Sequence, residues 1–114
     1  MQRLKGAPGL TTLRSDEAWE ATEYEGIKVR RLFVDRKRAT VSLLVKMAAG
    51  ARYPRHRHAA VEQCYVVEGD LRTSETVLLA GDYQRAEPDS VHGMQWTENG
   101  CTALIISSIH NEFF

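Results

Sequence analysis

The chain has 114 residues, of which 43% are hydrophobic and 26% are charged, a composition typical of one globular domain with a modest core. Fifteen Lys and Arg residues balance fifteen Asp and Glu residues, so no net charge favours nucleic acid or an anionic membrane. The sequence has no apolar stretch of about eighteen residues, no visible secretory signal and only two cysteines, far apart. We therefore expect a single cytoplasmic domain over residues 1–114.

The first quarter of the chain carries few strand signals, and residues 1–26 are predicted to be a short N-terminal extension. Residues 11–13 fit a short strand. Ser15, Asp16 and Glu17 have the residue types that cap a helix, just ahead of Trp19. The extension is thus expected to hold one short strand and one turn of helix.

Strand signals dominate from residue 27 onwards. Residues 27–34 and 40–47 are rich in apolar and β-branched side chains and are separated by a charged turn, which predicts a hairpin. Further strands are expected over residues 61–68, ended by Gly69 and Asp70, and then over 76–79, 91–97 and 102–107. Many short strands with glycine-marked turns indicate an all-β sandwich or barrel, with its core over residues 27–108.

Two histidines, His56 and His58, stand two residues apart, and Glu62 follows four residues after His58. Side chains alternate between the faces of a strand, so all three share one face of an extended segment and can converge on one ion. Taken alone, two histidines that alternate with Arg55 and Arg57 fit an exposed basic loop better. The apolar residues after Glu62 favour the ion, because an unpaired carboxylate on a buried strand is costly and a metal removes that cost.

These spacings resemble the signature of the cupin family. The first half, Gly-x5-His-x-His-x3,4-Glu-x6-Gly, is matched at every specified position by Gly50, His56, His58, Glu62 and Gly69. The second half is matched by Gly81 and, eleven residues later, His92, while Pro88 comes one position late, Ser90 stands near the usual glycine and Trp96 replaces an asparagine. The resemblance implies a double-stranded β-helix (a jelly-roll barrel) in which His56, His58, Glu62 and His92 hold one divalent metal.

Five further side chains are candidates to line a pocket around this ion: Cys64, Met94, Trp96, Tyr53 and Tyr83. Cys64 shares the strand parity of Glu62, although a small buried hydrophobe is its simplest interpretation. Met94 and Trp96 share the parity of His92, and such residues on a strand are usually plain core. The two tyrosines are potential hydrogen-bond donors.

The order of segments narrows the resemblance to one branch of the cupins. The segments follow one another as in the cupin-like domain of ChrR-type zinc anti-sigma factors. They are a tryptophan near the start, residues 25–32 and 40–50, the histidine segment, and residues 81–83, 88–92 and 99–101. That domain also occurs in stand-alone proteins and in some small-molecule dioxygenases. The resemblance covers roughly residues 19–108. Nothing in the 114 residues resembles the zinc-binding helical domain of the anti-sigma factors, so sigma-factor binding is not carried over.

The resemblance implies two alternative functions. The first is an Fe²⁺-dependent dioxygenase that cleaves a carbon–carbon bond of a small molecule, with Glu62 as a candidate acid or base. The second is a non-enzymatic sensor or ligand-binding module with zinc. Four protein ligands saturate a tetrahedral Zn²⁺, whereas octahedral Fe²⁺, Mn²⁺ or Ni²⁺ keeps two open positions. Small cupins commonly dimerise, so a homodimer through the N-terminal strands is also expected.

Overall fold

The structure, a computed structural model, describes residues 3–4 and 8–113. Within these residues it contains strands and no helix, hence no helix long and apolar enough to cross a membrane. The strands are β1 (Arg3–Leu4), β2 (Thr12–Leu13), β3 (Glu20–Ala21), β4 (Ile27–Asp35), β5 (Thr40–Met47), β6 (Arg52–Tyr53), β7 (His56–Arg57), β8 (Glu62–Arg72), β9 (Val77–Leu79), β10 (Tyr83–Ala86), β11 (Val91–His92), β12 (Gln95–Trp96), β13 (Cys101–Ser108) and β14 (Glu112–Phe113). The predicted all-β class is confirmed.

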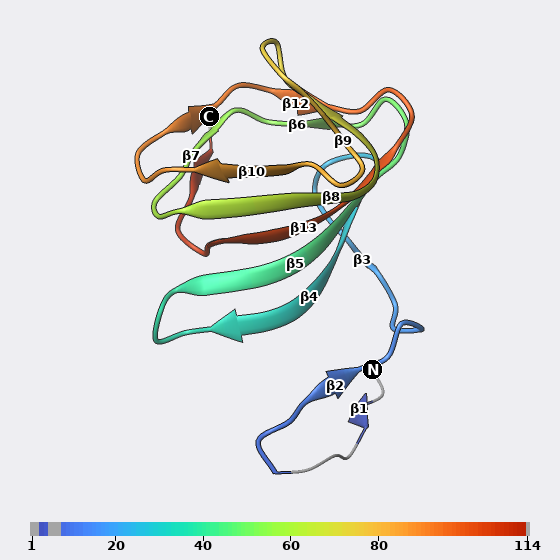
Figure 1. The fold of residues 1–114 in the computed structure, drawn as a ribbon, viewed down its shortest axis with the longest axis vertical. Coiled ribbons are helices and arrows are strands. Elements are labelled where there is room, and N and C mark those ends of the chain that lie inside the picture. The colour runs from blue at the N-terminus through green and yellow to red at the C-terminus, as the bar shows by residue number, and fades with distance from the viewer. Residues whose placement is uncertain (1–2, 5–7, 114) are drawn as a thin grey trace.

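The main sheet is antiparallel and follows the order β3-β4-β5-β13-β8-β12-β6, with β9 and β10 also paired to β8 (Figure 1). The predicted hairpin is confirmed, because β4 and β5 pair from Ile27 opposite Met47 to Asp35 opposite Thr40. Strand β13 then lies between β5 and β8 and joins two segments that are distant in sequence. Inward apolar side chains of these strands, among them Ile27, Met47 and Val66, form the buried core.

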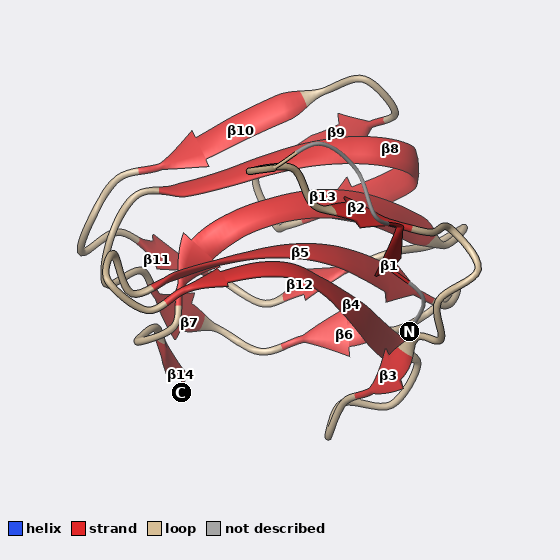
Figure 2. Ribbon diagram, turned by 90° about the horizontal axis from the view of Figure 1, so that it is seen from below, coloured by secondary structure: helices blue, strands red, loops and turns tan. Residues whose placement is uncertain are grey.

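Strand β8 curls and belongs to both sides of the barrel (Figure 2). Its first half pairs with β10 and β13, and its second half pairs with β9 and β12. The predicted end at Gly69 and Asp70 is wrong, since the strand continues to Arg72. Gly69 has a φ of 81°, and the pairing with β13 shifts register between Thr102 and Ala103. This bulge bends the strand without ending it.

Asp70 fixes the turn at the end of the β12–β13 connection. Its carboxylate accepts the backbone N–H groups of Glu98 and Asn99 at 2.9 and 3.0 Å, and the Arg72 guanidinium at 2.7 Å. Burial alone raises the pKa of Asp70, but these hydrogen bonds outweigh it and hold the pKa below its usual range. The carboxylate therefore ties β8 to the turn in its ionised form.

The N-terminal extension packs on β4 and β5 without a helix. The predicted helical turn is wrong, because Ser15 and Asp16 form a turn and Trp19 lies over Arg30 and Lys46 in two cation–π contacts. The segment is extended because Glu20 and Ala21 of β3 pair with β4 immediately after Trp19. The short strand predicted over residues 11–13 is confirmed as β2, which pairs with β1.

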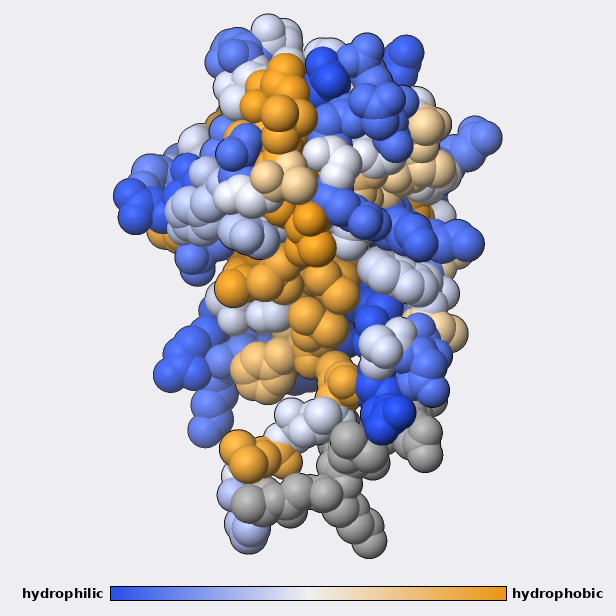
Figure 3. Space-filling model, turned by 45° about the vertical axis from the view of Figure 1, so that its right-hand side comes forward, coloured by the Kyte–Doolittle hydropathy of each residue, from blue (hydrophilic) through white to orange (hydrophobic). Residues whose placement is uncertain are grey.

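An apolar band runs over the surface of the molecule (Figure 3). On β8, Tyr65 and Val67 alternate with buried residues and are 46% and 50% exposed, and Phe33 on β4 is 62% exposed. Alternation places these side chains on the outside of the sheet, opposite the core. Contiguous exposed apolar surface of this kind is characteristic of association sites.

Candidate metal centre

The sheet made of β11, β7 and β14 closes one end of the barrel and brings the predicted metal ligands together. His56 lies on β7 directly opposite His92 on β11, and Glu62 begins β8. The histidines and the glutamate do not share one strand, because the chain leaves the strand conformation between Arg57 and Glu62. His56, Glu62 and His92 come from three strands and His58 from the loop that follows β7, and their ligand atoms all lie within 4.8 Å of one another.

The carboxylate of Glu62 is the centre of this cluster. Its Oε2 contacts His58 Nε2 and lies 3.9 Å from His56 Nε2 and 3.7 Å from His92 Nδ1. The imidazole rings of His58 and His92 are 4.5 Å apart between centroids. His56, His58 and Glu62 are buried, and His92 is half-buried. Four ligand groups thus face one small volume that is shielded from solvent.

Two of the histidines are held by hydrogen bonds behind the cluster. His56 Nδ1 lies 3.0 Å from the carbonyl oxygen of Pro54, and His58 Nδ1 lies 3.1 Å from that of Ser90. A carbonyl only accepts, so each Nδ1 carries the proton and each Nε2 is left facing the centre of the cluster. Metal-binding histidines in proteins are oriented in this way.

The charges of the cluster are strongly coupled. Burial raises the pKa of Glu62, but hydrogen bonds and charge from His56 and His58 outweigh it and lower the pKa to about 2. Burial lowers the pKa of His92, and the neighbouring His58 adds to this effect. A carboxylate that stays ionised at neutral pH is in the protonation state that binds a cation.

The cluster also contains a buried polar atom without a partner. Nδ1 of His92 has no hydrogen bond within the described part of the chain, although buried polar atoms are nearly always paired. An ion bound at the centre satisfies this nitrogen and neutralises Glu62. Three imidazoles and one carboxylate suit Zn²⁺, Fe²⁺, Mn²⁺ and Ni²⁺, so the residues fit a single divalent metal.

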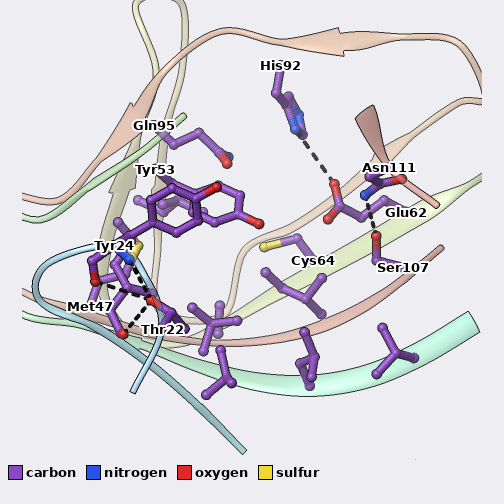
Figure 4. A pocket seen from close by; sticks show the side chains of 18 of the residues that line it. Thr22, Tyr24, Met47, Tyr53, Glu62, Cys64, His92, Gln95, Ser107 and Asn111 are labelled. Carbon is purple, nitrogen blue, oxygen red and sulfur yellow. Dashed lines mark hydrogen bonds and ion pairs between the residues drawn. The ribbon is translucent and has the colours of Figure 1, made fainter. Parts of the chain in front are cut away.

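A cavity of about 250 Å³ adjoins the cluster, and Glu62 and His92 are part of its wall (Figure 4). Of the predicted pocket residues, Cys64 and Tyr53 line it. Its remaining walls are mostly apolar side chains of β4, β5 and β13: Ile27, Val29, Val41, Leu43, Val45, Met47, Cys101, Ala103 and Ile105. The ion and a bound molecule would therefore share one enclosed space.

Tyr83, Met94 and Trp96 are not among the residues that line this cavity. Tyr83 is 53% exposed and donates a hydrogen bond to Gln63, and Met94 is 45% exposed. The strand predicted over residues 91–97 is interrupted between His92 and Gln95. This break changes the parity, so that Gln95 lines the cavity in place of Met94 and Trp96.

Cys64 lies inside the barrel as a protonated thiol. Burial raises its pKa to about 12, and the charge of Glu62 adds to the rise. The thiolate is the reactive form of cysteine, so at neutral pH Cys64 behaves as a small apolar side chain. Cys101, whose pKa burial raises to about 11, behaves in the same way.

The C-terminal segment contributes residues that the sequence did not single out. Phe113 on β14 pairs with His56 on β7, and their rings are 5.4 Å apart and tilted by 31°. Asn111 accepts the Ala59 N–H at 3.0 Å and donates to Ser107 Oγ at 2.8 Å. Asn111 and Phe113 line the cavity. A two-residue strand has no periodicity that could have revealed them.

The fold and the site together define a small cupin: the barrel, its interior cluster and the solved structures most similar to it agree on this class. The chain belongs to the ChrR cupin-like domain family, whose model matches residues 9–109. No curated protein matches the chain in sequence.

Three solved structures illustrate the similarity. An acetylacetone dioxygenase from Acinetobacter johnsonii has a TM-score of 0.83 at 14% identity, over 100% of this chain and 83% of that chain. A cupin-like protein of unknown function from Ralstonia eutropha has a TM-score of 0.72 at 23% identity, over 79% and 59%. The anti-sigma ChrR from Rhodobacter sphaeroides, solved in complex with SigE, has a TM-score of 0.69 at 22% identity, over 83% of this chain and 51% of that chain. The chain thus spans only about half to three fifths of the last two, and these identities establish the fold alone.

Proposed function

We propose that the protein is a mononuclear metal-binding cupin that acts on a small molecule, as an Fe²⁺-dependent dioxygenase that cleaves a carbon–carbon bond. The observation that carries this proposal is the shared wall between cluster and cavity. Glu62 and His92 belong to both. The similarity in fold to an acetylacetone dioxygenase supports the same direction.

In this proposal His56, His58, Glu62 and His92 hold the metal. Bound Fe²⁺ would supply the redox chemistry with dioxygen, because four protein ligands leave an octahedral ion two open positions. The apolar walls contributed by β5 and β13 exclude water and position the substrate. Glu62, which is ionised and directed at the cavity, is the candidate group to take or return a proton.

The alternative is a zinc-binding sensor or ligand-binding module without catalysis. The family match to the ChrR cupin-like domain supports it, and so does the tight grouping of four ligand atoms within 4.8 Å. A tetrahedral Zn²⁺ would be saturated by these four groups and would leave no position for substrate. The two proposals therefore differ in the metal and its open positions.

Metal analysis of protein purified without added metal separates them. The enzyme proposal expects about one iron per chain and oxygen consumption with acetylacetone or a phenolic ketone as substrate. The His92→Ala variant, as a control, is expected to lose both. Tightly held zinc at one ion per chain, without oxygen uptake after reconstitution with Fe²⁺, would contradict the enzyme and support the sensor.

A cytoplasmic homodimer remains a further prediction. The exposed apolar residues Phe33, Tyr65 and Val67 support association with a second copy, and the β1–β2 hairpin is a candidate to take part. Size-exclusion chromatography with light scattering should give twice the chain mass of 12.9 kDa. A monomer at working concentration would refute the homodimer.

A further inference from the structure

Two polar side chains lie next to each other in the mostly apolar wall of the cavity. Tyr53 on β6 and Gln95 on β12 are directly opposite in the antiparallel pairing, and both line the cavity. Residues at such positions have Cβ atoms about 5 Å apart, so their functional groups reach the same region. Figure 4 shows Gln95 and Tyr53 directed into the cavity, on the side of His92.

Neither group is used by the protein itself. Within residues 3–4 and 8–113, the hydroxyl of Tyr53 and the amide of Gln95 have no hydrogen-bond partner. Gln95 is only 8% exposed. Buried polar groups are normally paired, and an amide and a phenol together offer three N–H or O–H donors. A pair of this kind, aimed into a cavity, is suited to an oxygen atom of a bound molecule.

The cavity also excludes several classes of ligand. Among the described residues no Lys or Arg side chain lines it, so a carboxylate or phosphate away from the metal would have no countercharge there. A polyhydroxylated sugar would leave many of its hydroxyl groups against the apolar side chains of β4 and β5 without partners. At about 250 Å³ the space is smaller than pockets for drug-sized molecules. A small, mostly apolar molecule with few oxygen atoms remains.

We propose that Tyr53 and Gln95 form the recognition end of the cavity and bind a carbonyl oxygen of a small, mostly apolar ligand whose second oxygen approaches the metal. This inference rests on the proposed metal centre. It adds the substrate class and the two residues that select it. Tyr53 also contacts His56, with ring centroids 5.3 Å apart, so the recognition pair and the metal cluster are adjacent.

Two matched compounds test the proposal on protein loaded with Ni²⁺, whose octahedral coordination keeps two positions open, with dioxygen excluded. 4-Hydroxyacetophenone has a phenol and a ketone, whereas 4-ethylphenol lacks only the carbonyl oxygen. Titration calorimetry should show the ketone binding about 2- to 12-fold tighter than 4-ethylphenol, as expected for one hydrogen bond.

Tyr53→Phe and Gln95→Met should each reduce the preference for the ketone towards one. Tyr83→Phe removes a tyrosine hydroxyl that bonds Gln63 outside the cavity and should leave the preference unchanged, which makes it the matched control. Metal content and circular dichroism of each variant verify that the site and fold persist. Equal binding of the ketone and 4-ethylphenol, no binding of either, or an unchanged preference in Tyr53→Phe would overturn the inference. Wild-type protein that holds no metal would instead contradict the proposed function.

Discussion

Replacing Gly69 by alanine should destabilise the fold far more than the same change at Gly81, although both glycines belong to the family signature and both have positive φ angles of 81° and 92°. A Cβ at Gly69 would lie 1.9 Å from the carbonyl oxygen of Gly100 and 3.0 Å from Cα of Cys101. A Cβ at Gly81 would meet nothing within 4 Å. The two sites therefore share the conformational cost and differ in the clash.

The magnitude follows from these contacts. A positive φ costs an alanine about 1–2 kcal/mol, and this is the whole expected effect at Gly81. At Gly69 the Gly100 carbonyl must also move, and that carbonyl accepts the Asp70 N–H at 3.0 Å. Losing the hydrogen bond costs about 1 kcal/mol, and the displaced backbone adds about 1–3 kcal/mol of strain. We expect a total of about 3–6 kcal/mol.

Urea unfolding of the metal-free protein, followed by circular dichroism, measures both free energies without a contribution from metal binding. The Gly81→Ala variant gives the reference for φ alone, and Gly50→Ala, which also has open space around its Cβ, repeats it. The reasoning would be refuted if Gly69→Ala lay within about 0.5 kcal/mol of these two variants, a difference typical of surface substitutions.

Three further predictions follow from the site and its supports. Asp70→Asn should lower the free energy of unfolding by about 1–3 kcal/mol at pH 7. Because the pKa of Asp70 in the folded protein lies below 3.8, the wild type should lose this stabilisation as the pH falls below that value. An equal dependence of stability on acid pH in the wild type and in Asp70→Asn would contradict the role of Asp70. Phe113→Ala should speed metal loss to a chelator about 2- to 12-fold, since a ring contact with His56 is removed, whereas Phe33→Ala should not. Glu62→Gln should weaken metal binding at least about 10-fold; full metal content with full activity would disprove both roles of Glu62.

The metal cluster could be predicted from the sequence because its residues are fixed by short spacings and by one pairing. His56 and His58 are neighbours along the chain, and the β7–β11 register sets His92 opposite His56. The expectation that His56, His58 and Glu62 share one face of a single strand is wrong, since Glu62 stands on a separate strand from the histidines. Convergence came from the curvature of the barrel, which no local pattern contains.

The lining of the cavity was harder to predict, because strand parity fails wherever a strand is interrupted. Met94 and Trp96 were selected by counting from His92 along a continuous strand. The interruption after His92 places Gln95 in the cavity instead. Phe113 lay beyond the reach of any pattern, since its place depends on the pairing of two-residue strands at the barrel end.

X-ray absorption spectroscopy at the edge of the metal that copurifies with the protein tests the central claim most directly. We expect one ion per chain with three imidazole nitrogens and one carboxylate oxygen among its ligands. The imidazole signal should fall when His92 is replaced by alanine. A protein without metal, or an ion with no imidazole ligand, would contradict the proposed metal centre.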